Sequence, residues 1–133
     1  MPAIVVALFL AAHGRVHASY AQQPAAPKPG APAWPFYLDH SWLLTPLGID
    51  ATGTRLVGFV LLGAVVAGYA VAALAVVGIA PAGWFAPVVV GASALSAVMI
   101  ALFFTPWIVF GFAIDAALIV AVVAADWRPG AIG

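Results

Sequence analysis

Two histidines and one aspartate have types and positions that could support chemistry inside an apolar setting. His13 and His17 are four residues apart in an apolar stretch, so on a helix they share one face. Asp115 is the acid placed deep within another apolar stretch. Imidazole and carboxylate groups bind metals, handle protons and pair with each other. We therefore expect His13, His17 and Asp115 to form an intramembrane polar cluster.

Arg15 adds a permanent positive charge between the two histidines. On a helix that turns about 100° per residue, Arg15 points roughly 200° away from His13. A guanidinium can make a two-pronged contact with a carboxylate, whereas an imidazole can donate or accept a hydrogen bond. The sequence leaves open which of the two pairs with Asp115. Arg15 is expected either to join the cluster or to extend toward lipid headgroups.

Four interpretations of the cluster are open. His13, His17 and Asp115 could provide three ligands to a metal ion, or one histidine could ligate a haem. The cluster could also handle protons or hold a quinone headgroup. In the fourth interpretation the polar groups satisfy one another and tie the first apolar stretch to the last. We favour this clasp, because a charge near the bilayer centre costs about 2.5–3.5 kcal/mol and so needs a partner. No metal or other cofactor is predicted.

The composition indicates an integral membrane protein. Of 133 residues, 66% are hydrophobic and 6% are charged, and the mean hydropathy is +1.19. A soluble domain has about 25% charged residues. The net charge is zero, so the chain lacks the basic surface of a nucleic-acid-binding protein. With no cysteine, disulfides and thiolate-ligated metals are excluded.

Four apolar stretches have the length of membrane helices, at about residues 2–21, 56–79, 84–104 and 108–125. Short turn sequences separate the last three, so these neighbours must be antiparallel. We predict an all-α fold, with residues 1–133 forming one membrane domain. The domain is expected to be an up-and-down four-helix bundle, multi-pass in a bacterial inner membrane. We expect both termini in the cytoplasm and the long loop outside.

Small residues recur in the last three apolar stretches. Gly58, Gly63 and Gly68 are spaced by five, which does not fit the GxxxG dimer motif. Small side chains let membrane helices approach closely, so these residues predict tight packing within the bundle. Tyr69, the most polar side chain of the second stretch, is expected to bond to a neighbouring helix.

Residues 22–55 form a long loop of different composition. Its first part, "QQPAAPKPGAP", is Pro-rich and predicts an extended, hydrated segment. We expect Ser41 to Leu47 to form a turn or short helix on the membrane surface, and Asp39 and His40 to cover the mouth of the polar cluster. Tryptophan favours the headgroup level of a bilayer. Five tryptophans are therefore predicted to be interface anchors: Trp34, Trp42, Trp84, Trp107 and Trp127.

A cleavable signal peptide is the alternative to a retained first helix. "SYA" at Ser19 to Ala21 resembles a small-residue cleavage site. However, the basic segment that begins a signal peptide is missing, and His13, Arg15 and His17 occupy the region before cleavage. We expect the first stretch to be retained as a membrane helix.

The chain resembles the DoxX-like family of small four-span bacterial membrane proteins. The resemblance rests on "LFLAAHGRVH" in the first stretch, "WPFYLDHSWLL" in the loop and "RLVGFVLLGAVVAGYAVAAL" in the second stretch. It implies a four-helix bundle, and it implies a link to quinone-dependent sulfur oxidation or other redox complexes for some members. It assigns no catalytic residue to this sequence.

From these observations we expect a small accessory or scaffold subunit of a larger bacterial membrane complex, of respiratory or redox type. The expected partners are the lipid bilayer and other membrane subunits. No activity of its own is expected, because the sequence has no complete catalytic constellation. The alternative is a DoxX-type, quinone-linked oxidoreductase component that uses the cluster of His13, His17 and Asp115. A transporter ranks lowest, because no internal repeat is visible.

Overall fold

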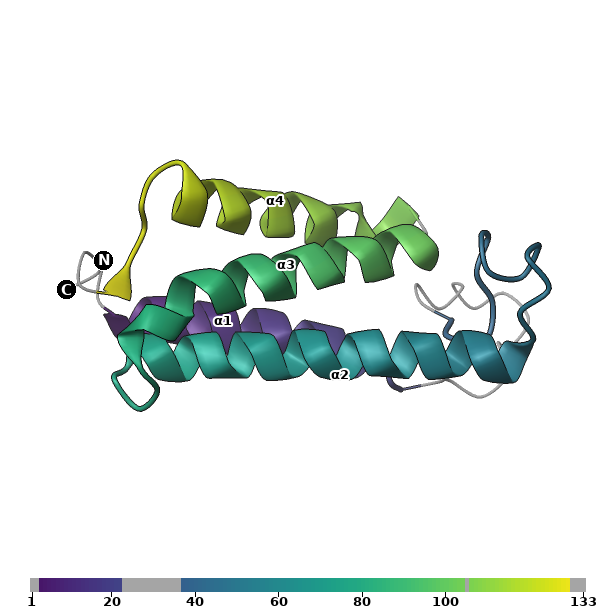
Figure 1. Ribbon diagram of the computed structural model, residues 1–133, viewed down its shortest axis with the longest axis horizontal. Coiled ribbons are helices and arrows are strands. Elements are labelled where there is room, and N and C mark those ends of the chain that lie inside the picture. The colour runs from purple at the N-terminus through teal and green to yellow at the C-terminus, as the bar shows by residue number, and fades with distance from the viewer. Residues whose placement is uncertain (1–2, 23–36, 105, 130–133) are drawn as a thin grey trace.

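The described part of the chain is all α-helical. The computed structural model describes residues 3–22, 37–104 and 106–129, with the exception of the Trp107 side chain. These residues form four α-helices: α1 (Ala3–Ser19), α2 (Ala51–Val76), α3 (Phe85–Leu102) and α4 (Val109–Val123). Short 3₁₀ turns, η1 (Ala82–Trp84) and η2 (Pro106–Ile108), precede α3 and α4. The four helices run lengthwise beside one another (Figure 1).

The helices are connected up and down. Helix α1 begins at the end of the bundle where α4 finishes, and the α2–α3 turn lies at that same end (Figure 1). Helix α1 packs on α2, α2 on α3, and α3 on α4, whereas direct backbone contact between α1 and α4 is sparse. The direct link between α1 and α4 is made by the side chains of His13 and Asp115.

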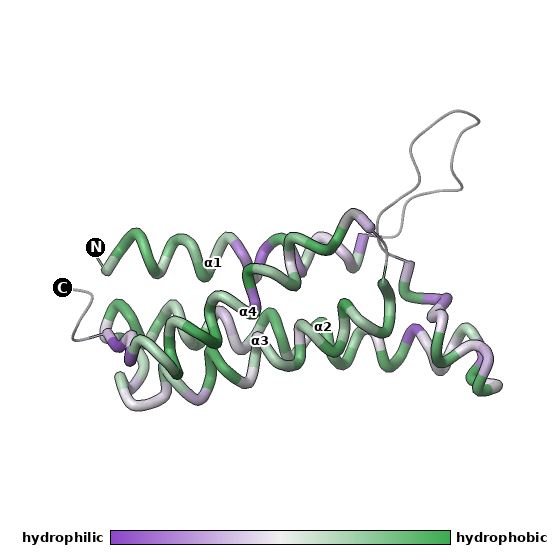
Figure 2. Tube along the Cα trace, turned by 90° about the horizontal axis from the view of Figure 1, so that it is seen from above, coloured by the Kyte–Doolittle hydropathy of each residue, from purple (hydrophilic) through white to green (hydrophobic). Residues whose placement is uncertain are grey.

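Two helical segments are long and apolar enough to cross a membrane. They are Ala51–Val76 and Ala82–Leu102, the second being η1 joined to α3. Helices α1 and α4 are also apolar but shorter, at 17 and 15 residues. The hydropathy of the trace is high along all four helices (Figure 2). These features support a membrane setting.

Helix α2 begins earlier than hydropathy predicts. The expected stretch was 56–79, whereas the helix covers Ala51–Val76. Asp50 explains the early start of α2, because its Oδ1 accepts a hydrogen bond of 2.7 Å from the Gly53 amide and caps the N-terminus of the helix. At the other end Gly78 has a φ of +78°, a conformation that helps to terminate a helix.

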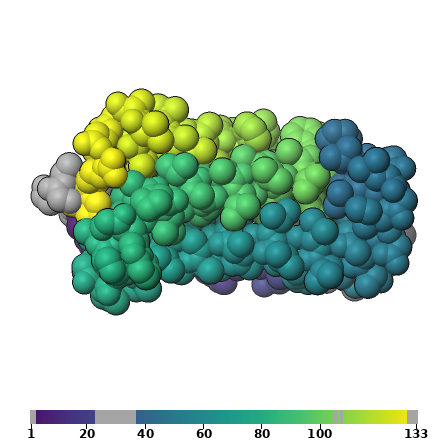
Figure 3. Space-filling view, in the orientation of Figure 1, coloured from purple at the N-terminus to yellow at the C-terminus, as the bar shows by residue number. Residues whose placement is uncertain are grey.

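Residues 37–50 fold over one end of the bundle, as the space-filling view shows (Figure 3). The Ser41 hydroxyl donates to the Leu102 carbonyl at 2.6 Å, and the Trp42 indole N–H donates to the Ala101 carbonyl at 2.6 Å. Carbonyls in the last turn of a helix have no partner within that helix. The loop thus caps α3 from a distance in sequence. Residues 42–48 form turns here, as expected for this segment.

The apolar core has two parts. One lies toward the start of α1 and includes Leu10, Val65, Phe85 and Val89. The other lies under the 37–50 loop and includes Leu38, Met99 and Phe103. The polar residues described next lie between these two parts.

Candidate functional site

A chain of polar contacts connects all four helices. Helix α1 contributes His13 and His17, α2 contributes Tyr69, α3 contributes Ser93 and Ser96, and α4 contributes Asp115. We call these six residues the polar cluster. All six are buried, with exposed fractions between 0% for Asp115 and 6% for His13. Hydrophilic stretches of α1 and α4 lie at the same level along the bundle (Figure 2).

Asp115 is at the centre of the cluster. Its Oδ1 lies 3.1 Å from His13 Nε2 and accepts a hydrogen bond of 2.6 Å from the Tyr69 hydroxyl. The Tyr69 oxygen lies 2.9 Å from the Ser93 hydroxyl, which can donate to it because the tyrosine proton is directed at Asp115. Tyr69 therefore bonds to a neighbouring helix, which confirms the expectation for this residue.

The two histidines face each other. His13 Nε2 and His17 Nε2 are 3.4 Å apart, and the Ser96 hydroxyl lies 3.1 Å from His17 Nε2. With Asp115 as a carboxylate, the proton must be on His13 Nε2, because otherwise two acceptors would face each other. A hydrogen bond between the rings then makes His17 Nε2 the acceptor. The His13 N–H therefore lies between two acceptors, the His17 Nε2 lone pair and the Asp115 carboxylate.

Two buried atoms of the cluster have no hydrogen-bond partner in the described structure: His17 Nδ1 and Asp115 Oδ2. A buried polar atom without a partner costs about 1–3 kcal/mol. The cluster is therefore connected but not fully satisfied.

Arg15 is separate from the cluster. Its side chain is exposed, as its helical offset from His13 predicts, and within the described residues it forms no ion pair. His13, and not Arg15, is the basic residue that pairs with Asp115. The sequence alone had left both pairings open.

The loop residues expected over the cluster occupy other places. Asp39 forms a half-exposed ion pair with Arg55 of α2, at 3.7 Å, and His40 is exposed. Leu38 and Ser41 are the buried residues of this loop, and the Leu38 side chain packs over Gly58 of α2. Apolar residues rather than Asp39 and His40 thus cover this end.

The predicted interface tryptophans are in different environments. Trp42 and Trp84 are 59% and 55% exposed. Trp127 is partly buried and its ring packs edge-on against Phe85, with ring centroids 5.7 Å apart. Trp34 and the Trp107 side chain lie outside the described residues.

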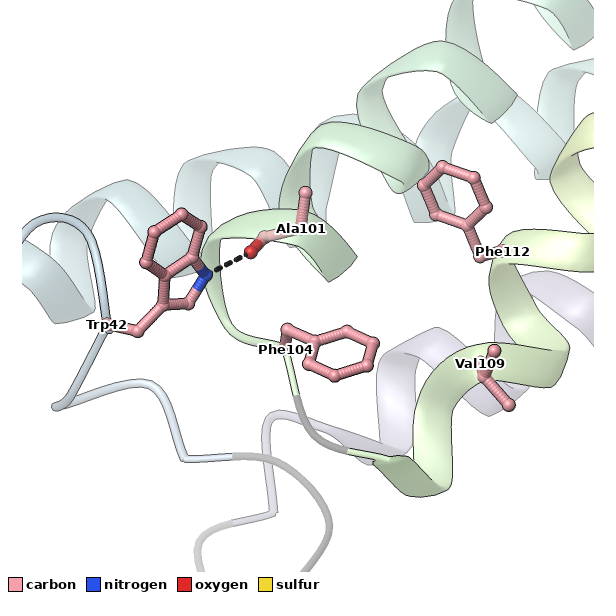
Figure 4. A pocket seen from close by; sticks show the side chains of 5 residues that line it. All are labelled: Trp42, Ala101, Phe104, Val109 and Phe112. Atoms are coloured by element: carbon pink, nitrogen blue, oxygen red, sulfur yellow. Dashed lines mark hydrogen bonds between the residues drawn. The ribbon is translucent and has the colours of Figure 1, made fainter.

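An apolar pocket lies apart from the polar cluster. It has a volume of about 530 Å³ and lies between the end of α3, the start of α4 and the loop. Its lining residues are Trp42, Ala101, Phe104, Val109 and Phe112 (Figure 4). The one polar side-chain group among them, the Trp42 N–H, is already bonded to Ala101 (Figure 4). The pocket suits an apolar chain better than a polar headgroup.

The sequence missed two members of the cluster. Ser93 and Ser96 are three residues apart on α3 and were not identified as polar partners. Their spacing, which places two hydroxyls on one face of a helix, is the signal that could have identified them.

No protein-family model matches the chain, and no curated protein or solved structure matches it either. The contacts above are therefore the basis for the function considered next.

Proposed function

We propose that this chain is a small, non-catalytic accessory or scaffold subunit of a larger bacterial membrane complex. The observation that carries the proposal is the polar cluster. Its six side chains come from all four helices and direct their polar groups mainly at one another. A catalytic site needs polar groups directed at a substrate, whereas a clasp needs them directed across helix interfaces.

The proposal places all four helices in the bilayer. Helices α1 and α4 are short, but the 17 residues of α1 still rise about 25 Å. A bilayer can thin locally to match a short hydrophobic span. Their outer faces are apolar, with Leu8 of α1 62% exposed and Phe110 of α4 77% exposed. Lipid or another subunit would cover such faces.

An apolar pocket beside α1 supports the partner part of the proposal. Val5, Val6 and Phe9 of α1 and Trp127 line this second pocket, of about 290 Å³. The backbones of α1 and α4 make few close contacts, and His13 and Asp115 bridge them. A transmembrane helix of another subunit would bury this face, since small gaps between membrane helices are filled by packing.

The test is native purification of the tagged chain from its own membranes in a mild detergent, followed by mass spectrometry. A partner at constant stoichiometry is expected. Replacement of Phe9 by Ser should weaken its recovery, whereas replacement of Leu56, exposed on α2, should not. A monomeric chain, active by itself, would overturn the proposal.

A DoxX-type, quinone-linked redox component is the second candidate. The observation in its favour is that histidine, aspartate and tyrosine in contact are the groups used to relay protons within membranes. The resemblance noted in the sequence also points to it. Quinone reduction that is lost in His13→Gln, with assembly of the complex intact, would favour this candidate over the scaffold.

A further inference from the structure

We propose that the polar cluster is a closed binding site for one divalent transition-metal ion of the zinc class. The ligands are His13 Nε2, His17 Nε2 and the Asp115 carboxylate, whose ligand atoms all lie within 4.8 Å of one another. The nearby hydroxyls of Ser96 and Tyr69 offer the fourth position. The site goes beyond the proposed function, because a hydrogen-bonded clasp needs no ion.

The distances between the ligand atoms carry the first step. Zinc binds imidazole nitrogen at about 2.0–2.1 Å with tetrahedral geometry, so two of its ligand atoms lie roughly 3.3 Å apart. His13 Nε2 is 3.4 Å from His17 Nε2 and 3.1 Å from Asp115 Oδ1. The longest of the three separations must shorten for ligation. The Asp115 Oδ2 atom has no hydrogen-bond partner in the described structure, so its lone pairs are available to an ion, whereas Oδ1 is held by Tyr69 and His13.

The second argument for a metal ion is the number of protons available between the three ligand atoms. Three ligand atoms converge, yet His13 Nε2 supplies the one proton that lies between them. The Tyr69 hydroxyl donates to Asp115 and the Ser96 hydroxyl can donate to His17, but among the three ligand atoms themselves the His13 N–H is the single proton. Ligation by His13 Nε2 requires the proton of the neutral ring to move to Nδ1, after which a dication at this point would accept all three lone pairs. It would also offset a carboxylate buried in an apolar bundle, where a lone charge is costly.

The donor set selects the class of ion. Two imidazoles and a carboxylate, without a thiolate, suit zinc, copper, iron or nickel and not magnesium or calcium, which prefer oxygen ligands. All three ligands are fully or nearly fully buried. Two histidines and one carboxylate leave the fourth position of a tetrahedral zinc ion to a hydroxyl or a water molecule, and the burial of all three ligands encloses the site.

The test is a titration of the full-length protein, stripped of metal with a chelator and kept in detergent, with Co²⁺ as the spectroscopic substitute for Zn²⁺. We expect one ion per chain, the intense visible absorption of tetrahedral Co²⁺, its displacement by Zn²⁺, and a higher Tm with Zn²⁺ but not with Mg²⁺. His17→Gln should abolish the absorption. His40→Gln, which removes an exposed imidazole, is the matched control and should retain it.

If His17→Gln does not fold, X-ray absorption at the zinc edge of the wild-type protein provides the second measurement. It should show two imidazoles and at least one oxygen ligand. Octahedral Co²⁺ only, equal binding by His17→Gln and wild type, or no stoichiometric ion would each overturn the metal site. A protein that binds no ion but still assembles with its partner would leave the proposed scaffold function intact.

Discussion

At the residue scale, Asp115 is the side chain on which the cluster depends. Its Oδ1 receives contacts from α1 through His13 and from α2 through Tyr69. Hydrogen bonds to a charged group contribute about 1.5–3 kcal/mol, roughly twice the contribution of neutral ones. One carboxylate therefore stabilises the positions of two helices relative to a third.

Asp115→Asn should lower the free energy of unfolding by about 1–3 kcal/mol, because it keeps the shape of the side chain and removes its charge. Unfolding in detergent, followed by circular dichroism, measures the loss. Asp126→Asn is the control, since Asp126 forms an exposed pair with Arg128. Equal stability of Asp115→Asn and wild type would show that the carboxylate contributes nothing to the bundle.

A double-mutant cycle distinguishes the two basic residues near Asp115. His13→Ala and Asp115→Ala should couple by about 0.5–3 kcal/mol, because the side chains are in contact. Arg15→Ala and Asp115→Ala should be additive within about 0.5 kcal/mol, because Arg15 is exposed and outside the cluster. The free energies of unfolding of the single and double variants give both coupling terms. The reverse pattern would assign the ion pair to Arg15.

The sequence predicted four of the six cluster members: His13, His17 and Asp115 as a group, and Tyr69 as a side chain bonded to a neighbouring helix. His13, His17 and Asp115 are rare types inside apolar stretches, where a polar group without a partner is costly, so their meeting followed from burial alone. Ser93 and Ser96 could not be assigned in the same way. Hydroxyls are common in membrane helix interfaces, and the rotation of α3 about its axis is set by packing, which the sequence pattern does not specify.

At the element scale, α2 and α3 approach each other where glycine allows it. A Cβ added at Gly68 would lie 2.8 Å from the Cβ of Ala92 and 3.6 Å from its Cα. The obstructing atoms are those of a short side chain and its backbone, which cannot rotate away. The five-residue glycine spacing predicted tight packing, and Gly68 is a position where the structure shows it.

Gly68→Ala should destabilise the protein by about 1–3 kcal/mol, because the extra methyl group forces α2 and α3 apart. Gly63→Ala is the matched control, since a Cβ there meets nothing within 4 Å. Alanine favours helix over glycine by up to about 1 kcal/mol, so the control should be neutral or stabilising. Thermal unfolding of both variants in one detergent provides the measurement. A stable Gly68→Ala would contradict the close approach of these helices.

The number and order of the helices followed from the sequence, because apolar stretches separated by turn residues leave few alternatives in lipid. The ends of the helices were harder to predict. Hydropathy placed the start of α2 near residue 56, but the Asp50 cap extends the helix to Ala51. The capping of α3 by Ser41 and Trp42 joins residues far apart in the chain, so no local pattern could indicate it.

Ser41→Ala should loosen the loop from α3. The change leaves the Leu102 carbonyl without its donor at 2.6 Å, at a cost of about 0.5–1.5 kcal/mol. The expected readout is faster amide hydrogen exchange in residues 42–49, with little change in the exchange of α1. Thr52→Ala, which alters an exposed hydroxyl on the first turn of α2, is the control. Unchanged amide exchange in the loop would mean that the turns are stable without the hydrogen bond from Ser41 to Leu102.

At the scale of the whole molecule, two helical segments are long and apolar enough to cross a bilayer, and the proposed four-span arrangement adds α1 and α4. The up-and-down order places the α2–α3 turn at the same end as the start of α1 and the finish of α4 (Figure 1). The 37–50 loop lies at the other end. With four spans these two ends face opposite sides of the membrane, whereas two spans would leave α1 and α4 on its surface.

The chain has no cysteine, so single cysteines can be introduced without background labelling. We expect cysteine at Gly83 and at Ala124 to react with an impermeant maleimide from one side, and cysteine at Leu47 from the other. All three positions are exposed, and a Cβ at Gly83 meets nothing within 4 Å. If only α2 and α3 crossed the membrane, Ala124 would react from the same side as Leu47.

Cysteine at Ala3 makes the corresponding test for α1, because a spanning α1 puts residue 3 on the same side of the membrane as Gly83. Agreement of Ala3, Gly83 and Ala124 would place His13, His17 and Asp115 within the bilayer, where their mutual contacts matter most.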